Sequence, residues 1–242
     1  MGPFLLRQKA GNPPEVSIWE GKYMAIGKEA FAEAFTQALQ DKGKRKFTQA
    51  AELIVNFANI DFNKQVNRLN LEVLLPKGKG RDYKIAVFTD GGQVQFDAKN
   101  AGYDTITTEE AQKLASDRPK LKKLAKTHEF LAEPKMMMVV GKHLGQFLGT
   151  RDKLPRPLIG GKMTDLADKA KKSVKIKSRG KYLPVAQCAV GTENMGAQDL
   201  AENAYAVYEA MRAKVGGDFF IRNVMVKLSM GKPVKVEDAK KK

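Results

Sequence analysis

The sequence predicts two domains of mixed α and β structure: an α+β domain formed by both ends of the chain and an α/β domain inserted into it. Half-buried strands and amphipathic helices occur in the first 77 residues and again after residue 157, whereas short apolar strands alternate with helices in between. Stretches rich in Gly, Pro and Lys separate these parts at residues 76–80 and 145–157. Two crossings that lie side by side form a natural hinge.

The elements of the first domain follow from side-chain periodicity. Residues 27–42 predict an amphipathic helix because Phe31 and Phe35 recur at the four-residue spacing. Residues 51–57 and 68–75 alternate apolar and polar side chains, as strands with one buried face do. We expect an open antiparallel sheet with helices, similar to a split βαβ unit. Later segments predict a helix at 166–172 capped by Thr164 and Asp165, a helix at 196–215, and strands at 174–177, 183–190 and 221–228.

The middle of the chain has a different pattern. Residues 84–88 (KIAVF) are almost continuously apolar, which is typical of a strand buried on both faces. Helices are predicted at 93–101, from 108 onwards, at 119–127 and at 134–144, with extended segments at 104–107 and 130–132. This alternation predicts a small parallel α/β layer.

The predicted domain boundaries follow from these patterns. Residues 24–77 and 158–236 form the discontinuous α+β domain, 78–157 form the inserted domain, and 1–23 and 237–242 are expected to be flexible termini. The hinge residues are expected to be Pro76, Lys77 and Gly78 in the first crossing and Leu154, Pro155, Arg156 and Pro157 in the second.

Charge is the first clue to function. The net charge is +16, of which residues 78–157 carry +5 and the remainder +11. Such an excess indicates a polyanionic partner, with nucleic acid first and an anionic membrane second. A highly soluble protein from a salty or hot cell is the alternative reading. The apolar runs are far shorter than the roughly 20 residues of a membrane span, so we expect a soluble protein.

The sequence predicts no catalytic site, no cofactor and no metal. It contains no phosphate-binding loop, and glycines 141, 145 and 149 do not form a dinucleotide fingerprint, so we interpret them as loop and hinge glycines. His128 and His143 are isolated and are expected to be solvated or capping residues. The single cysteine, Cys188, is expected to be a small core residue, with no disulfide. An RNA-modifying or nucleotide-dependent enzyme that uses the inserted domain, and a general RNA chaperone, remain alternatives.

Three features favour RNA binding. Residues 46–48 (KFT) place a cation, an aromatic ring and a hydroxyl at the entrance to a strand. Lys175 and Lys177 lie two apart on one face of a strand, a suitable spacing for phosphate contacts. Residues 228–233 (LSMGKP) end a strand with a hydroxyl and a glycine, where an RNA backbone is able to approach closely.

Long motifs carry a family resemblance. They are KFTQAAELIV (46–55) with NRLNLEVLLP (67–76), LGQFLGTRDKLPRP (144–157), and VMVKLSMGKPV (224–234) with VGTE (190–193) upstream. In this order they resemble the family of large-subunit ribosomal protein one, the protein of the mobile stalk beside the exit site, and the first strand is similar to its archaeal branch. The resemblance extends over about residues 24–236.

The resemblance implies both fold and function. It implies an RNA-binding domain made from both chain ends, with a Rossmann-like domain inserted on a two-stranded hinge. It implies a non-enzymatic constituent of the large ribosomal subunit in the cytoplasm, which binds stalk rRNA and other ribosomal components and takes part in the release of deacylated tRNA from the exit site. Many members also repress translation of their own mRNA. We expect no membrane partner and a monomer when free.

The RNA contacts implied by the resemblance lie on several segments. They are Lys46, Phe47, Thr48, Glu52, Lys175, Lys177, Asn223, Lys227, Ser229, Met230 and Gly231. Ala50, Asn223 and Ser229 replace a hydroxyl residue, a serine and a threonine of the family pattern. In the second hinge, Gln146, Thr150 and Asp152 replace Pro, Pro and Gly. As a hypothesis, Glu52 accepts a hydrogen bond from a ribose 2′-hydroxyl.

Overall fold

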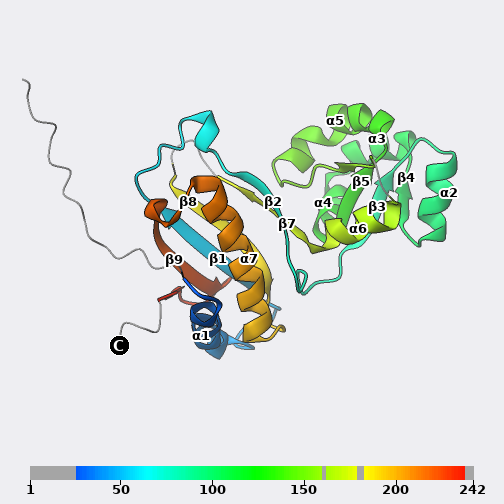
Figure 1. Cartoon of the computed structure of the whole chain (residues 1–242). Helices are drawn as coiled ribbons and strands as arrows, with labels where there is room; N and C mark the ends of the chain where they lie inside the picture. Colours follow the sequence, from blue (N-terminus) through cyan, green and yellow to red (C-terminus); the bar gives the residue numbers. More distant parts are fainter. Residues whose placement is uncertain (1–25, 160–161, 179–182, 238–242) are drawn as a thin grey trace, which may run out of the picture.

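The computed structural model describes residues 26–159, 162–178 and 183–237. The chain forms two units of mixed α and β structure, each with its own sheet (Figure 1). The termini that the sequence predicts to be flexible, 1–23 and 237–242, lie outside the described residues except for Glu237.

The first unit contains a four-stranded antiparallel sheet. Its strands are β10 (Val234–Lys235), β9 (Ile221–Leu228), β1 (Ala50–Phe57) and β8 (Val185–Thr192), in that order across the sheet. Because β8 and β9 are both antiparallel to β1, they run parallel to each other on either side of it. Helix α7 (Ala197–Val215) joins them, which gives a split βαβ arrangement.

Two helices cover one face of this sheet, and the other face is open. Every second residue of β1 from Ala51 to Phe57 is buried in one core with residues of α1 (Lys28–Ala38) and α7. Phe31 and Phe35 of α1 are fully buried there, as their spacing predicts. Short 3₁₀ helices, η1 (Leu39–Asp41), η2 (Gln65–Asn67) and η3 (Asp218–Phe220), lie in the connections.

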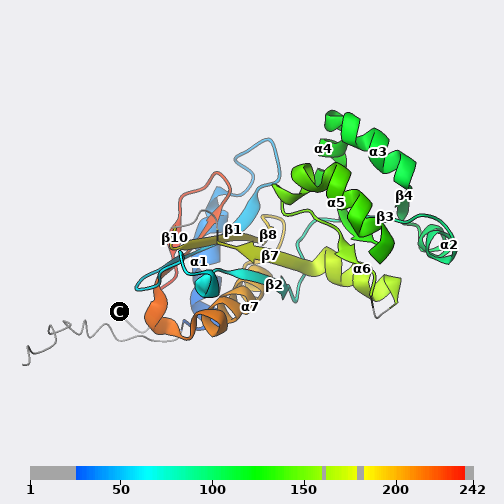
Figure 2. The same ribbon diagram turned by 90° about the horizontal axis from the view of Figure 1, so that it is seen from above.

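Strand β2 (Asn70–Leu74) pairs with β7 (Ser173–Lys177) in a separate two-stranded antiparallel ribbon. The prediction that it joins the main sheet is therefore wrong. Alternation along a strand shows that one face is buried, but it does not identify the partner strand. Seen from above, the ribbon leads from the first unit toward the inserted unit (Figure 2).

The inserted unit has a parallel sheet with helices on both faces. Its strands, in spatial order, are β4 (Asp104–Ile106), β3 (Lys84–Phe88), β5 (His128–Ala132) and β6 (Arg156–Pro157). Helices α2 (Gln93–Asn100) and α6 (Met163–Lys172) pack on one face. Helices α3 (Thr108–Ser116), α4 (Arg118–Thr127) and α5 (Pro134–Gly149) pack on the other.

Strand β3 is buried on both sides, which confirms the prediction from its apolar sequence. Ile85 and Val87 contact the core beneath α2 and α6. Ala86 and Phe88 contact the core beneath α3, α4 and α5. A strand between two helical layers needs apolar side chains at successive positions.

The second predicted boundary, at residue 157, is too early. Ala167 and Ala170 of α6 are fully buried against Ile85 and other residues of the inserted sheet. The chain therefore returns to the first unit at Lys172 and Ser173, where α6 meets β7. Counted to residue 172, the inserted unit carries a net charge of +7 and the rest of the chain +9. The charge difference between the units is thus smaller than the sequence boundaries imply.

The residues predicted for the second crossing, Leu154, Pro155, Arg156 and Pro157, lie inside the inserted unit. Two of them form β6, which pairs with the end of β5 at the edge of the parallel sheet. Proline is tolerated on an edge strand as well as in a linker, so its presence did not separate the two possibilities.

Glycines 141, 145 and 149 lie within helix α5, so their interpretation as loop and hinge glycines is wrong. The apolar residues Val140, Leu144 and Leu148 recur every four residues and are fully buried. Their burial outweighs the helix penalty of about 1 kcal/mol per glycine. The predicted cap of α6 is also wrong, because the helix begins at Met163, with neither Thr164 nor Asp165 at the cap position.

Candidate nucleic-acid interface

The open face of the first sheet carries polar pairs on neighbouring strands. Glu52 of β1 lies opposite Lys227 of β9, and Asn56 lies opposite Asn223. Lys227 Nζ is 3.6 Å from Glu52 Oε2, and Asn56 donates a hydrogen bond to Asn223. The two charged side chains are 26% and 29% exposed, so a ligand is able to reach them.

Ser229 follows β9 and orients the Glu52 carboxylate. Its hydroxyl oxygen accepts a hydrogen bond from the backbone N–H of Ala50 at 3.2 Å. The same hydroxyl lies 3.2 Å from Glu52 Oε1 and 3.3 Å from the carbonyl oxygen of Ala50, either of which takes its proton. Lys227 and Ser229 therefore hold Glu52 from two sides.

A residue that the sequence prediction missed, Gln49, links the motifs that surround this site. Its buried side chain accepts a hydrogen bond from the Met230 N–H at 3.1 Å and donates one to Glu193 Oε2 at 3.2 Å. Its neighbours Thr48 and Ala50 belong to the same motif, and Glu193 ends the VGTE motif. The sequence does contain a signal for Gln49, because it is a polar residue that lies between the candidate contacts Thr48 and Glu52.

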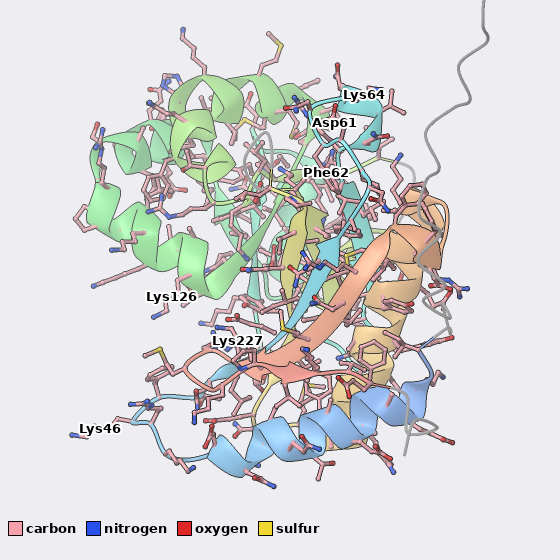
Figure 3. All side chains as sticks on the ribbon, turned by 90° about the vertical axis from the view of Figure 1, so that its left-hand side faces the viewer. Lys46, Asp61, Phe62, Lys64, Lys126 and Lys227 are labelled. Carbon is pink, nitrogen blue, oxygen red and sulfur yellow. The ribbon has the colours of Figure 1, made fainter. Side chains whose placement is uncertain are left out.

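Exposed side chains from two loops border this polar cluster. Lys46, Phe47 and Thr48 are exposed on the loop before β1, and Met230 is exposed in the turn after β9. Gly231 closes that turn by donating a hydrogen bond to the Leu228 carbonyl. Phe47 is 54% exposed, and its ring is available to stack on a base. Figure 3 shows Lys46 on its loop and Lys227 on β9.

The remaining two predicted contacts, Lys175 and Lys177, face the inserted unit. Lys177 forms an ion pair with Asp152, whose φ of 55° lies in the region that favours glycine. Lys175 Nζ donates to the carbonyl oxygen of Leu154 at 3.3 Å. Burial lowers the pKa of Lys175, and the nearby Arg156 lowers it further. In this structure both lysines therefore have protein partners.

The first crossing is clamped to the first unit by Asn203 of α7, another residue that the sequence prediction missed. Its Nδ2 donates to the carbonyl oxygens of Gly78 at 2.9 Å and Val190 at 2.8 Å, and its Oδ1 accepts from the Lys77 N–H at 2.9 Å. Two of the three predicted hinge residues in Pro76–Gly78 are thus tied to α7.

The clamp continues beyond Gly78. Thr192 donates to the carbonyl oxygen of Gly80 at 3.2 Å, and Arg81 donates to that of Thr48 at 3.1 Å. Hydrogen bonds therefore tie the first crossing to the first unit as far as Arg81.

A buried carboxylate lies where the inserted unit faces the first. Glu129 Oε1 accepts hydrogen bonds from Lys79 Nζ and Lys153 Nζ, each at 2.7 Å. Burial alone raises the pKa of Glu129, but the two ammonium groups outweigh it and hold that pKa below its ordinary value. Burial lowers the pKa of Lys79, and Glu129 opposes this effect.

This arrangement predicts an acid-dependent loss of stability. Because the pKa of Glu129 is lower in the folded state than in the unfolded state, the folded state binds fewer protons. The stabilisation is present above the unfolded pKa of about 4.3 and is lost as the pH falls through the folded pKa. We expect Glu129→Gln to show a shallower decrease in the free energy of unfolding below about pH 5 than the unmodified chain.

Denaturant unfolding at a series of pH values checks this expectation. Glu109→Gln, at an exposed site, controls for the loss of one carboxylate. Parallel curves for Glu129→Gln and the unmodified chain contradict the prediction.

The sequence pattern of the Ribosomal protein L1p/L10e family matches residues 38–232, which include every candidate contact from Lys46 to Gly231. The chain belongs to this family.

Curated relatives agree along most of their length. The chain is 39% identical over 219 residues to the large ribosomal subunit protein uL1 of Thermococcus kodakarensis, which covers 88% of this chain and 100% of that protein. It is 37% identical over 222 residues to the uL1 protein of Methanocaldococcus jannaschii, covering 90% of this chain and 100% of that protein. The resemblance to this family and its archaeal branch, stated from the motifs, is confirmed.

In this member of the L1p/L10e family, the two histidines and the cysteine differ in their surroundings. His128 is buried, so the expectation that it is solvated is wrong, and its ring nitrogens lie 2.7 Å from Asp104 Oδ2 and from Thr127 Oγ1. Its place at the C-cap of α4, where its backbone N–H donates to the carbonyl oxygen of Leu124, agrees with the expected capping role. His143 is exposed on α5. Cys188 is buried in the first core, as predicted, and burial raises its pKa to about 12.

The described residues of this family member form neither a membrane-spanning helix nor a metal cluster. None of its described helices combines the length and the apolar content of a membrane span. Within the same residues, no three His, Cys, Asp or Glu side chains are grouped as a metal site requires.

Proposed function

We propose that this chain is a constituent of the large ribosomal subunit that binds the rRNA of the mobile stalk near the exit site. The observation that supports this most directly is the cluster of Glu52, Lys227 and Ser229 on an open sheet face, bordered by the exposed Lys46 and Phe47. Membership of a ribosomal protein family supports the same role.

The cluster has the chemistry that folded RNA requires. Proteins recognise folded RNA through shape, phosphates and the 2′-hydroxyl. The Glu52 carboxylate has about four acceptor positions, and the contacts to Lys227 and Ser229 occupy at most two of them. A free acceptor beside a cation suits a ribose hydroxyl next to its phosphate, whereas a purely electrostatic site gains nothing from a carboxylate.

The same interface accounts for the further roles that we propose. A fold in the chain's own mRNA that resembles the stalk rRNA competes for the open face, and its binding represses translation. The chain also takes part in the release of deacylated tRNA, together with the stalk that carries it. Both roles rest on rRNA binding in the cytoplasmic ribosome.

Binding to stalk RNA across a salt series tests the proposal. An equally long RNA with a different fold is the competitor. We expect the affinity for stalk RNA to fall with salt, because phosphate contacts release counterions, while the preference over the competitor persists. Equal affinities for both RNAs at every salt concentration indicate charge alone and contradict the proposal.

Removing the hydroxyl that holds Glu52 is expected to weaken this binding. Ser229→Ala removes contacts to Ala50 and Glu52, and we expect the affinity for stalk RNA to fall by about 1–2 kcal/mol, or roughly tenfold. Ser116→Ala, at an exposed site on α3, is the matched control and leaves the affinity unchanged. Equal affinities for the two variants contradict the assignment of Ser229.

Glu52→Ala tests the proposed ribose contact. We expect it to reduce discrimination between the stalk RNA and an analogue with 2′-deoxy sugars. If Glu52→Ala binds stalk RNA as tightly as the unmodified chain does, the carboxylate makes no favourable contact with RNA.

A further inference from the structure

A cavity of about 270 Å³ lies between the two units. One wall is the open face of the first sheet at Ala50, Gln187 and Ala189, and Ala189 lies opposite Glu52. The other walls come from the first crossing, the inserted unit and β7. The cavity therefore adjoins the proposed RNA interface but extends beyond its residues.

The cavity is lined by more cations than carboxylates. The cations are Lys79, Arg81, Arg151, Lys153, Arg156 and Lys175. The carboxylates in its lining are Glu129 and Asp152, and Asp152 is paired with Lys177. One oxygen of Glu129 serves both Lys79 and Lys153, so a single negative charge faces two ammonium groups. This imbalance in a partly closed space favours an anion.

Donors in the lining also have spare hydrogen-bonding capacity. Arg156 uses Nη2 to contact Glu72 and Ser173, but its buried Nε has no hydrogen-bond partner within the described residues. Lys175 makes one long hydrogen bond, to the Leu154 carbonyl oxygen. A buried donor without an acceptor is destabilising, and an anion bound beside Arg156 supplies the missing acceptor.

We propose that this cavity binds a phosphate group, held by Arg156, Lys175 and Lys153. Guanidinium and ammonium groups are the side chains that proteins use for phosphate. The volume is suited to a small group rather than to a large cofactor. The phosphate comes either from an RNA backbone that passes from the open sheet face into the cavity or from a free phosphate ion. The first source rests on the proposed RNA binding, and the second does not.

Inorganic phosphate titrated into the full chain tests the site. Chloride is lowered to hold the ionic strength constant, and the midpoint of thermal unfolding is measured. Lys153→Gln is expected to weaken phosphate binding about tenfold, because it removes a cation from the cavity. Glu129→Gln is expected to strengthen it about tenfold, because it removes the opposing charge. Lys122→Gln, at an exposed site on α4, is the control.

The variants separate the site from general effects of phosphate. Phosphate stabilises most folded proteins because it is excluded from their surface. This non-specific increase in the unfolding midpoint is expected to be equal in all variants. A saturable shift that decreases in Lys153→Gln and increases in Glu129→Gln supports the site. The same phosphate dependence in all four proteins overturns the proposed site. Because the two variants are expected to change phosphate binding in opposite directions, a general loss of stability cannot produce the expected result.

Stalk RNA distinguishes the two sources. If the phosphate belongs to RNA, inorganic phosphate competes with RNA at constant ionic strength, and Lys153→Gln reduces the salt slope of RNA binding by about one. If it is a free ion, free and RNA-bound protein bind phosphate equally. Either result supports the cavity as a phosphate site. Failure of stalk RNA to bind at all contradicts the proposed function but leaves the phosphate titration of the free chain valid.

Discussion

Asn203→Ala is expected to lower the free energy of unfolding by about 3 kcal/mol. The Asn203 side chain is fully buried and bonds to backbone groups of Lys77, Gly78 and Val190. Alanine removes all three hydrogen bonds and leaves the backbone groups of Lys77, Gly78 and Val190 without their side-chain partner, although only Val190 is fully buried. Each such group costs about 1–3 kcal/mol, and partial access of water to the crossing limits the sum.

Urea unfolding with a matched variant on the same helix checks this expectation. Gln198→Ala, at an exposed position near the start of α7, is expected to change the stability by less than about 0.5 kcal/mol. The slope of the unfolding transition is expected to stay the same, because the fold is retained. If Asn203→Ala loses no more stability than Gln198→Ala, the clamp on the first crossing does not contribute to stability.

Gly80→Ala has an expected effect of similar size, a loss of about 3 kcal/mol in the free energy of unfolding. Gly80 has a φ of +66°, where a side chain adds roughly 1 kcal/mol of backbone strain. A Cβ at this position lies 2.6 Å from both Met195 Sδ and Thr192 Oγ1, far inside van der Waals contact. Thr192 is buried and bonds to the Gly80 carbonyl, so relief of the overlap displaces the crossing.

Gly43→Ala separates the backbone strain from the steric overlap. Gly43 has a similar φ of +74°, but a Cβ there meets nothing within 4 Å. The Gly43→Ala variant is therefore expected to lose about 1 kcal/mol of the free energy of unfolding, from backbone strain alone. The difference between the two variants measures the close approach of the crossing to the loop before α7. Equal losses mean that Met195 and Thr192 move aside at no cost.

Several features of the fold were predictable because they depend on local sequence. The four-residue spacing of Phe31 and Phe35 and the alternation along residues 51–57 each identify a buried face without reference to another segment. Residues 84–88 differ from residues 51–57 because their strand is covered on both sides, and that difference is also visible in the sequence. Predictions of this kind were confirmed.

The pairing of strands and the boundaries of the inserted unit were less predictable, because they depend on segments far apart in the chain. Residues 68–75 carry the pattern of a strand, but their pairing with β7 depends on where the chain returns. The return point was placed too early because the proline-rich edge strand β6 resembles a linker in composition. The glycines of α5 were misassigned because burial of Leu144 and Leu148 decides the helix.

The features of the candidate interface fall into the same two groups, those predictable from local sequence and those that depend on distant segments. By itself, the sequence determined the excess of positive charge, the placement of a cation, an aromatic ring and a hydroxyl before the first strand, and the motifs that identify the family. Only the tertiary structure decided that Glu52 meets Lys227 and Ser229 on one open face, and that Lys175 and Lys177 turn to the inserted unit. It alone decided that Asn203 holds the crossing and that Glu129 lies between two lysines. The physical reason is that periodicity and composition report what each segment buries, whereas hydrogen bonds and ion pairs between distant segments depend on how the packed segments are placed.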